Sequence, residues 1–412
     1  MEKTISGVDI EGYSSGGEGV ARLYDGRVVF VANAARGDIL EIRLTDERPR
    51  VARAEIVRVL ESSPYRVTPD CPAFPRCGGC DFRHITYEEE LRAKLQRVND
   101  ALRRIGGSAV LAGEILSTGQ IDGYRNKAVL HSDGVSCGFY ARQSHEIVNI
   151  DHCRLLKDDI NAALKGAAMG AANESSIESS INHESTLRSG RNGLDPPLEE
   201  TQTLRSGRNG RNLPGNETLT LRSGRNGLSP PLEEMLDGLI FGISGFFQVN
   251  TSAALLLYRK AREYAAMSKD ETLADLYCGV GALTLFVGRD AGRAYGVDSN
   301  AEAVETAREN ATRNGLAHIE FFAADAGKWE YAHKSPDCVI VDPPRSGLSK
   351  DAVRKILELA PKRIIYISCD PATLARDIRR LDGFSSEEIC AVDMFPRTAN
   401  VECCSLLTRH SR

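Results

Sequence analysis

Residues 272–298 read TLADLYCGVGALTLFVGRDAGRAYGVD, and this stretch decides the fold. An apolar run, TLADLY, leads into a turn that contains Gly279 and Gly281 and opens a helix. A second apolar run, RAYGVD, then ends at Asp298. Strand, glycine turn, helix and strand in this order are typical of a βαβ unit in a parallel sheet.

The same alternation continues to the end of the chain. The runs IEFFAAD, DCVIVDPP and KRIIYISCD each end in a turn, and EEICAVDMF and NVECCSLLTR are two further strand candidates. Helical segments such as 301–314 and 351–359 separate the runs, so we predict an open, mostly parallel α/β sheet over residues 238–412. Ligands of such sheets bind at the carboxyl ends of the strands. The polar residues at these ends are Tyr277, Asp298, Asp325, Asp342 and Cys369.

The N-terminal residues have a different pattern. GRVVFVAN (26–33), ILEIRLT (39–45) and ARAEIVRVL (52–60) are short runs rich in β-branched residues, separated by glycine turns. They predict a small β-barrel of the oligonucleotide-binding type over residues 1–62. An RNA-binding role fits such a barrel, although any small barrel has the same pattern.

A repeat interrupts the chain before the α/β region. The heptapeptide LRSGRNG begins at Leu187, Leu204 and Leu221, with a period of 17 residues. Gly, Asn, Arg, Ser and Pro dominate the surrounding residues 171–235, and few large apolar side chains are present. We therefore predict a disordered or weakly ordered insertion there.

Composition narrows the class of protein. The chain has 412 residues, 42% of them hydrophobic, and a formal net charge of −5, which excludes binding of nucleic acid through bulk positive charge but not through a local basic groove. There is no apolar run of membrane-spanning length and no signal peptide, so we expect a cytoplasmic protein without membrane contact. In this setting the 11 cysteines predict metal ligands, nucleophiles or core thiols rather than disulfides.

The glycine turn points to a nucleoside cofactor. A carboxylate at the end of the second strand, as at Asp298, suits a ribose diol. NAD is one candidate, but the turn lacks the third glycine of the dinucleotide fingerprint. S-adenosylmethionine fits better because it has no pyrophosphate to cradle.

A candidate nucleophilic cysteine, Cys369, lies near the C-terminus. Ser368-Cys369-Asp370-Pro371 places a thiol at a strand end, just before a helix, where the helix N-terminus would lower the thiol pKa. A thiolate that adds to C6 of uracil makes C5 nucleophilic toward a sulfonium methyl group, and a base must then remove the C5 proton. Asp342 and Glu402 are the nearby carboxylate candidates in the motifs DPPR and VE.

Taken together, these motifs resemble the RNA uracil-5 methyltransferase family, in particular its ribosomal, iron–sulfur branch. The resemblance covers residues 1–165 and 238–412. It is carried by the motifs FFQVN (246–250), DLYCG (275–279), DPPR (342–345), SCDP (368–371) and DMFPRTANVE (393–402). It implies a class I, Rossmann-like α/β methyltransferase domain, an N-terminal TRAM barrel that binds RNA, and a small α+β iron–sulfur domain at 63–165.

The resemblance also implies roles for individual residues. Cys369 would be the nucleophile and Glu402 the base. The S-adenosylmethionine site would be lined by Gln248, Tyr277, Asp298, Asp325 and Asp342. Three positions depart from the family pattern: Asn400 replaces His, Ala282 replaces Asn, and Asp370 replaces Asn.

Four cysteines form a further candidate site. Cys71, Cys77 and Cys80 have the spacing C-x5-C-x2-C, and Cys153 follows in the segment NIDHC. Such thiols bind zinc or an iron–sulfur cluster, and spacing alone slightly favours zinc. The resemblance instead implies a 4Fe-4S cluster with a structural role. The remaining six cysteines are expected to pack as small apolar groups.

We therefore expect an enzyme that methylates C5 of one uridine in 23S ribosomal RNA. Transfer RNA is the alternative substrate, and an NAD-linked oxidoreductase and a catalytically weak RNA-binding homologue are alternative functions. The oligomeric state stays open, with a monomer as the default.

Overall fold

The structure is a computed structural model that describes residues 4–133, 136–170, 217–223, 233–242, 247–331 and 335–410. The chain forms two compact units. Unit 1 comprises Met1–Lys94, Ala128–Leu221 and Phe395–Ala399, and unit 2 comprises Leu95–Lys127, Arg222–Met394 and Asn400–Arg412. Residues 95–127 of the predicted central domain thus belong to the second unit, and the three-domain division stays a prediction.

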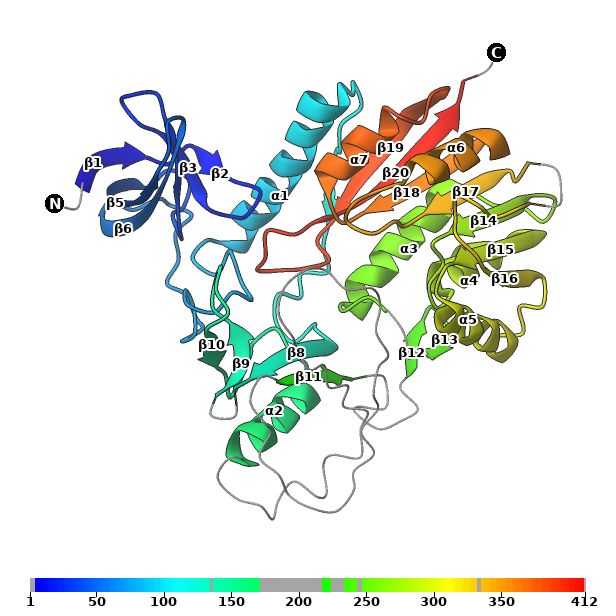
Figure 1. The fold of residues 1–412 in the computed structure, drawn as a ribbon, viewed down its shortest axis with the longest axis horizontal. Coiled ribbons are helices and arrows are strands. Elements are labelled where there is room, and N and C mark those ends of the chain that lie inside the picture. The colour runs from blue at the N-terminus through cyan, green and yellow to red at the C-terminus, as the bar shows by residue number, and fades with distance from the viewer. Residues whose placement is uncertain are drawn as a thin grey trace. The chain divides into compact units, whose positions relative to one another are not determined.

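The N-terminal part of unit 1 is a strongly curved sheet, blue in Figure 1. Its strands are β1 (Thr4–Asp9), β2 (Gly12–Tyr13), β3 (Gly19–Arg22), β4 (Val28–Val31), β5 (Ile39–Glu47) and β6 (Val51–Glu61), in the order β1-β5-β6-β4-β3-β2. Alternate residues such as Val29, Val31, Leu40 and Ile42 are fully buried inside the curve. The three predicted strand runs correspond to β4, β5 and β6.

A second sheet of unit 1 has the order β10-β9-β8-β11. Its strands are β8 (Lys127–Ser132), β9 (Cys137–Tyr140), β10 (Ile147–Asn149) and β11 (Glu217–Arg222), and helix α2 (Asp158–Gly170) follows β10 in the chain. Strand β11 lies within the predicted insertion, as does most of β12 (Glu233–Leu236). These two stretches of the predicted insertion form strands, while 171–216 and 224–232 lie outside the described residues.

Helix α1 (Tyr87–Ala101) links the two units along the chain. Just before the helix, Thr86 Oγ1 accepts a hydrogen bond from the Glu89 N–H at 3.4 Å, and the Glu89 carboxylate pairs with Arg36 and Arg92. The helix continues as a π-helical turn, η1 (Leu102–Gly106), and ends at Gly107, whose φ is 59°.

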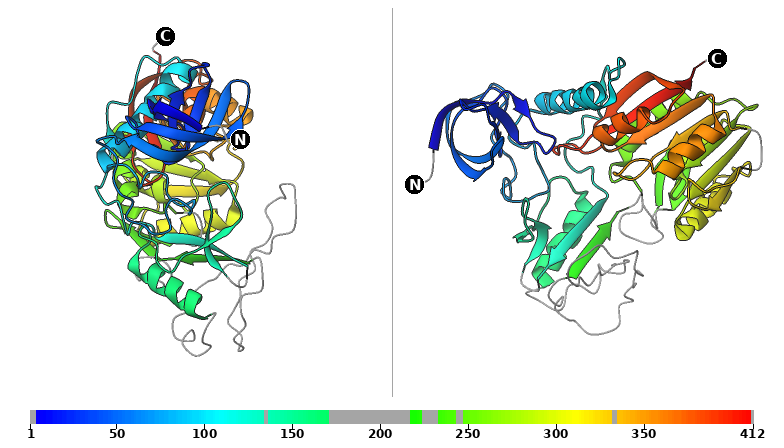
Figure 2. Two further views of the ribbon diagram at one scale, coloured as in Figure 1. Left: turned by 90° about the vertical axis from the view of Figure 1, so that its left-hand side faces the viewer. Right: turned by 45° about the horizontal axis from the view of Figure 1, so that its top comes forward.

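Unit 2 contains the predicted α/β sheet, with the order β16-β15-β14-β17-β18-β20-β19-β7. Its strands are β7 (Ile115–Leu116), β14 (Thr272–Leu276), β15 (Arg293–Asp298), β16 (Ile319–Ala323), β17 (Cys338–Val341), β18 (Arg363–Ser368), β19 (Phe384–Val392) and β20 (Glu402–Arg409). Its helices are α3 (Thr251–Ala265), α4 (Ala282–Gly288), α5 (Ala301–Arg313), α6 (Lys350–Leu359) and α7 (Pro371–Ile378), and β12 pairs with β13 (Leu239–Gly242) as a separate hairpin. The sheet and its helices can be followed in Figure 2.

Both faces of this sheet are covered. On β14 and β17, Ala274, Leu276, Val339 and Val341 belong to one core with α6 and α7, and the residues between them are equally buried. Strands β14 to β18 are parallel, whereas β20 runs antiparallel to β18 and β19. The strand order reverses between β14 and β17, and ligands of open α/β sheets bind outside the carboxyl ends of the strands at such a point.

Candidate active site

The loop after β14 has an unusual backbone. Tyr277, Gly279 and Gly281 all have positive φ angles, of 109°, 53° and 81°. A Cβ on Gly281 would lie 2.8 Å from the Phe321 ring and 3.0 Å from Ala307, so only glycine fits there. Tyr277 is not a glycine, and holding it at positive φ stores backbone strain. Strain of this kind is common at ligand sites, where it fixes the direction of backbone groups.

Asp298 fixes this loop from the next strand. One carboxylate oxygen accepts the Gly279 N–H at 2.9 Å, and the other accepts the Asn300 N–H at 2.9 Å. A carboxylate has about four acceptor sites, so both oxygens keep capacity for a diol. The predicted ribose role is therefore compatible with this geometry, and Asp298 is also a structural support of the turn.

The two strands at the switch point present carboxyl groups side by side. Leu276 pairs with Val341, so Tyr277 and Asp342 follow neighbouring positions at the ends of β14 and β17. Burial raises the pKa of Asp342 to about 6. Burial likewise raises the pKa of Asp275, inside β14, to about 7, although Thr284 donates a hydrogen bond of 2.6 Å to it. The two buried carboxyl groups favour a cationic ligand, because a nearby positive charge would offset the cost of burying their negative charges.

Two other predicted cofactor residues lie at the margins of this arrangement. Asp325, exposed after β16, accepts the Gly327 N–H at 2.9 Å, and its charge adds to the effect of burial that raises the pKa of Tyr277 to about 12. Gln248 is buried just before α3, and its carbonyl accepts a hydrogen bond from the Asn126 amide at 3.1 Å. This hydrogen bond uses the main chain of Gln248 and not its side chain.

Cys369 and Glu402 come together through strand pairing. Strands β18 and β20 are antiparallel, and Ser368 pairs with Cys403. Continuing this register by one residue puts Cys369 opposite Glu402. Cys369 is half-buried, whereas the Glu402 side chain is buried, with 4% of its surface exposed. The two residues predicted as nucleophile and base therefore face one site.

The electrostatics of this pair correct one prediction. Burial, followed by the charge of Glu402, raises the pKa of the Cys369 thiol to about 11, and Asp342 adds to the increase. The expected lowering by the helix N-terminus is therefore not the net result, and the Asp370 carboxylate accepts the Ala372 and Thr373 N–H groups at the start of α7. Burial and Asp342 also raise the pKa of Glu402 well above its usual value.

Comparison with known proteins places this site in a family. Residues 242–410 match the family model described as tRNA (Uracil-5-)-methyltransferase, and residues 3–57 match the TRAM domain. A protein of Bacillus cereus described as an uncharacterized RNA methyltransferase is 31% identical, over 98% of this chain and 96% of its own length. The chain belongs to the RNA uracil-5 methyltransferase family.

Other relatives agree with this membership. An uncharacterized RNA methyltransferase of Caldanaerobacter subterraneus is 33% identical, over 98% of this chain and 97% of its own length. The crystal structure of a Pyrococcus abyssi tRNA (uracil-54, C5)-methyltransferase, in complex with S-adenosyl-L-homocysteine, has a TM-score of 0.70 and 28% identity, and the match covers 98% of this chain and 100% of that chain.

Family membership confirms several expectations. The protein is an RNA uracil-5 methyltransferase that uses S-adenosylmethionine, which decides against an NAD-linked oxidoreductase. The match at 3–57 confirms the TRAM domain, which consists of the curved sheet of β1 to β6. No helix in the described residues is long and apolar enough to cross a membrane.

Sequence reasoning missed two residues that act on the uracil-5 methyltransferase site. Arg345 donates a hydrogen bond to the Asn400 side chain at 3.4 Å, and its positive charge lowers the pKa values of both Cys369 and Glu402 against the larger effect of burial. Tyr258 of α3 is buried, and the charges of Asp342, Asp275 and Glu402 add to the effect of burial in raising its pKa. The DPPR motif was a signal for Arg345, but Tyr258 has no comparable sequence signal.

The four predicted metal ligands are not assembled in this structure. Cys71, Cys77 and Cys80 lie in one loop of unit 1, where the Cys77 N–H donates to the Ala73 carbonyl and the Gly79 N–H donates to Cys77 Sγ at 3.4 Å. The described residues contain no group of three or more His, Cys, Asp or Glu side chains arranged to hold a metal ion. The six cysteines predicted to pack in the core are all buried: Cys137, Cys278, Cys338, Cys390, Cys403 and Cys404.

Proposed function

We propose that this protein methylates C5 of one uridine in 23S ribosomal RNA through a covalent adduct with Cys369. S-adenosylmethionine supplies the methyl group. The observation that carries the proposal is the pairing of β18 with β20, which brings a half-exposed thiol opposite a buried carboxyl group beside Arg345 and Asp342.

The proposed reaction uses these groups in sequence. The Cys369 thiolate adds to C6 of the uracil, and the electron pair of the C5–C6 bond makes C5 nucleophilic. C5 then takes the methyl group as its bond to the sulfonium sulfur breaks, which leaves S-adenosylhomocysteine, and Glu402 removes the C5 proton. The electrons of that C–H bond restore the C5–C6 double bond as the C6–S bond breaks, and Cys369 leaves as thiolate.

The raised pKa values of Cys369 and Glu402 support a reaction in which the two groups ionise at different steps. A thiol and a carboxyl group that are both hard to ionise in the same site cannot easily carry two negative charges together. Arg345 is positioned to favour the thiolate, because its charge lowers the pKa of Cys369. Once Cys369 is bound to carbon, its charge is gone, and Glu402 ionises more readily to act as base.

The remaining predicted residues fit the binding of S-adenosylmethionine. We propose that Asp298 accepts hydrogen bonds from the ribose and that Tyr277, Asp325, Asp342 and Gln248 line the rest of the site. Support comes from the strained turn around Gly279 and from the buried carboxyl groups at the strand ends, which suit a sulfonium cation.

Transfer RNA is the second candidate substrate. It is favoured by the Pyrococcus abyssi protein, which acts on tRNA and matches this chain over nearly its full length. Incubation with labelled S-adenosylmethionine and either 23S ribosomal RNA or transfer RNA, followed by mapping of 5-methyluridine, separates the two. Label only in 23S ribosomal RNA would support the proposal, whereas label only in transfer RNA would replace it.

We also propose a 4Fe-4S cluster on Cys71, Cys77, Cys80 and Cys153, whose binding would draw together four thiols that form no metal-binding group in the described residues. These four thiols are partly exposed, in contrast to the six buried packing thiols, and all belong to unit 1. An anaerobic preparation should contain about four irons per chain. Replacing Cys80 with serine should lower the iron content, while replacing the buried Cys338 should not. Zinc in place of iron would reject the cluster.

A further inference from the structure

The outward face of the N-terminal sheet carries an unexpected aromatic residue. On β4, Val29 and Val31 point into the core and are fully buried, so Phe30 between them points outward and is only partly buried. On β6, Ala52 and Ala54 are buried in the same way, and Val51 and Arg53 therefore point outward. An aromatic ring on the solvent side of a barrel is not needed for its core.

Strand register brings the outward residues into a row. Phe30 on β4 pairs with Arg53 on β6, and Arg53 pairs with Asp46 on β5. The Arg53 guanidinium lies over the Phe30 ring, 5.9 Å from its centroid, and forms an ion pair with Glu18. The ring is thus flanked by a cation that is itself held in place.

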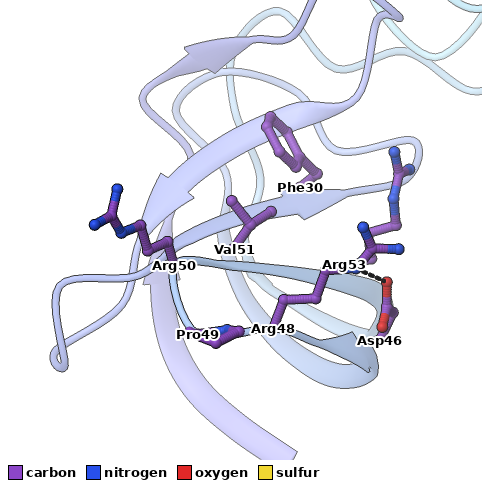
Figure 3. Close-up of a pocket in the computed structure, with 7 residues that line it drawn as sticks. All are labelled: Phe30, Asp46, Arg48, Pro49, Arg50, Val51 and Arg53. Carbon is purple, nitrogen blue, oxygen red and sulfur yellow. Dashed lines mark hydrogen bonds and ion pairs between the residues drawn. The ribbon is translucent and has the colours of Figure 1, made fainter.

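A groove surrounds this row, and we call it the Phe30 groove (Figure 3). It encloses about 540 Å³. It is lined by Phe30, Asp46, Arg48, Pro49, Arg50, Val51 and Arg53. The lining combines an apolar surface, from Phe30, Pro49 and Val51, with the three guanidinium groups of the turn between β5 and β6 and of β6 itself.

The groove retains positive charge that is available to a ligand. Arg48 forms an ion pair of 3.2 Å with Asp46, but a guanidinium has five N–H donors, and one carboxylate leaves several of them available. Arg50 is exposed, and the described residues provide no recorded ion pair or hydrogen bond for its side chain. An anion bound here would therefore meet Arg50 without displacing a carboxylate.

The combination points to one kind of occupant. A phosphate alone would use the arginines but not the aromatic ring, and the volume lies within the roughly 300–1,000 Å³ of small-ligand pockets, more than one phosphate requires. Unpaired nucleotides carry both a phosphate and a flat base whose face is open, and proteins bind them by stacking the base on aromatic rings beside arginines. Paired bases hide that face in the duplex.

We propose that the Phe30 groove binds one unpaired nucleotide of the RNA substrate, with its base stacked on Phe30 and its phosphate at Arg50. This inference rests on the RNA substrate of the proposed function. It assigns the barrel a contact that is independent of base identity, because every base has a stacking face.

The test uses an RNA without the methylation target. The full-length protein is titrated with an oligoadenylate of about twelve nucleotides that carries one 2-aminopurine, whose fluorescence falls on stacking. Phe30→Ala should weaken binding about tenfold and reduce the quenching, and Phe30→Trp should restore both. Tyr24→Ala is the matched control, because Tyr24 is an aromatic residue in the turn between β3 and β4, 83% exposed and outside the groove.

The phosphate contact is tested separately. Arg50→Gln should lower affinity and reduce the slope of log affinity against log salt by about 0.7, the value for one phosphate contact on a single strand. Arg58→Gln, an equal charge change on β6 outside the groove, should not change the slope. Because Arg50 is exposed, this variant keeps the test valid even if Phe30→Ala fails to fold.

Each outcome decides the proposal. If Phe30→Ala and Arg50→Gln both behave like their controls, the groove does not bind RNA. If Phe30→Ala loses affinity but quenching is unchanged, the stacking model is wrong. If polyglutamate displaces the RNA when carboxylate and phosphate groups are present at equal concentration, the groove is instead a site for an acidic protein. Groove-dependent binding without any 5-methyluridine formation would instead contradict the proposed function and leave the groove in place.

Discussion

Replacing Glu402 with glutamine should make the Cys369 thiol more reactive in the free protein, although the same change disables turnover. The reason is electrostatic. In the resting site, burial and the Glu402 carboxylate together raise the thiol pKa to about 11. Glutamine has nearly the same size but cannot ionise, so at any pH at which Glu402 is ionised the substitution lowers the thiol pKa and more thiolate is present.

The size of the effect follows from the strand geometry. At pH 8 a thiol with a pKa of about 11 is ionised in roughly one molecule in a thousand. Residues opposite each other on antiparallel strands lie about 5 Å apart, and two unit charges at that distance interact by roughly 3 kcal/mol at an effective dielectric constant of about 20. Because Cys369 is partly exposed, we expect about half of this, which corresponds to roughly a tenfold increase in thiolate.

The assay is the rate of alkylation by iodoacetamide, followed by mass spectrometry on the peptide that contains Cys369. For the unchanged protein the rate should rise about tenfold per pH unit from pH 7 to pH 10. Glu402→Gln should raise the rate by up to about tenfold at the pH values at which Glu402 is ionised, whereas Glu388→Gln, the same change at an exposed position of β19, should not. An equal or slower rate in Glu402→Gln would refute the electrostatic account of the site.

Three further predictions concern single residues. Arg345→Met should slow the same alkylation, because its charge lowers the thiol pKa, and a faster rate would contradict that role. Asp275→Asn should stabilise the protein at pH 8: the folded pKa of about 7 exceeds the unfolded value, so stability falls as pH rises from about 4 to about 7, by roughly 4 kcal/mol at most. Urea unfolding at pH 5 and pH 8 measures this, and an unchanged pH dependence would rule it out. Lys94→Met should cost about 3 kcal/mol in the same assay, because the fully buried Glu90 loses the nearer of two cations, Lys94 at 2.7 Å, and keeps Arg397 at 3.5 Å. Lys355→Met at a partly exposed pair is the control, and equal losses would count against the buried pair.

Local sequence signals predicted most of the secondary structure near the site. The helix predicted at 301–314 is α5, and the one predicted at 351–359 is α6. These elements were predictable because apolar spacing and caps act within one or two turns. Strand β7 was not predicted, because two residues are too few to form a pattern and its pairing with β19 is a tertiary contact.

The chemistry of the site was less predictable than its residues. The motif indicated Cys369 and Glu402, but their placement opposite each other depends on β20 running antiparallel beside β18. We predicted a lowered pKa for the Cys369 thiol, but the pKa is raised. The prediction used only the adjacent helix N-terminus, whereas burial and the charge of Glu402 depend on the tertiary structure. Arg345 illustrates the same limit, since its effect depends on groups from β18 and β20.

In the proposed reaction Cys369 and Glu402 act as nucleophile and base on one uridine. The most direct measurement is a denaturing gel of Glu402→Gln mixed with labelled S-adenosylmethionine and 23S ribosomal RNA. If Glu402 is the base, the gel should show a covalent protein–RNA band that contains the methyl label, because C5 has been methylated but its proton cannot leave. The band should be absent in the double variant that also carries Cys369→Ala. Normal 5-methyluridine formation by either single variant, Glu402→Gln or Cys369→Ala, would contradict the account.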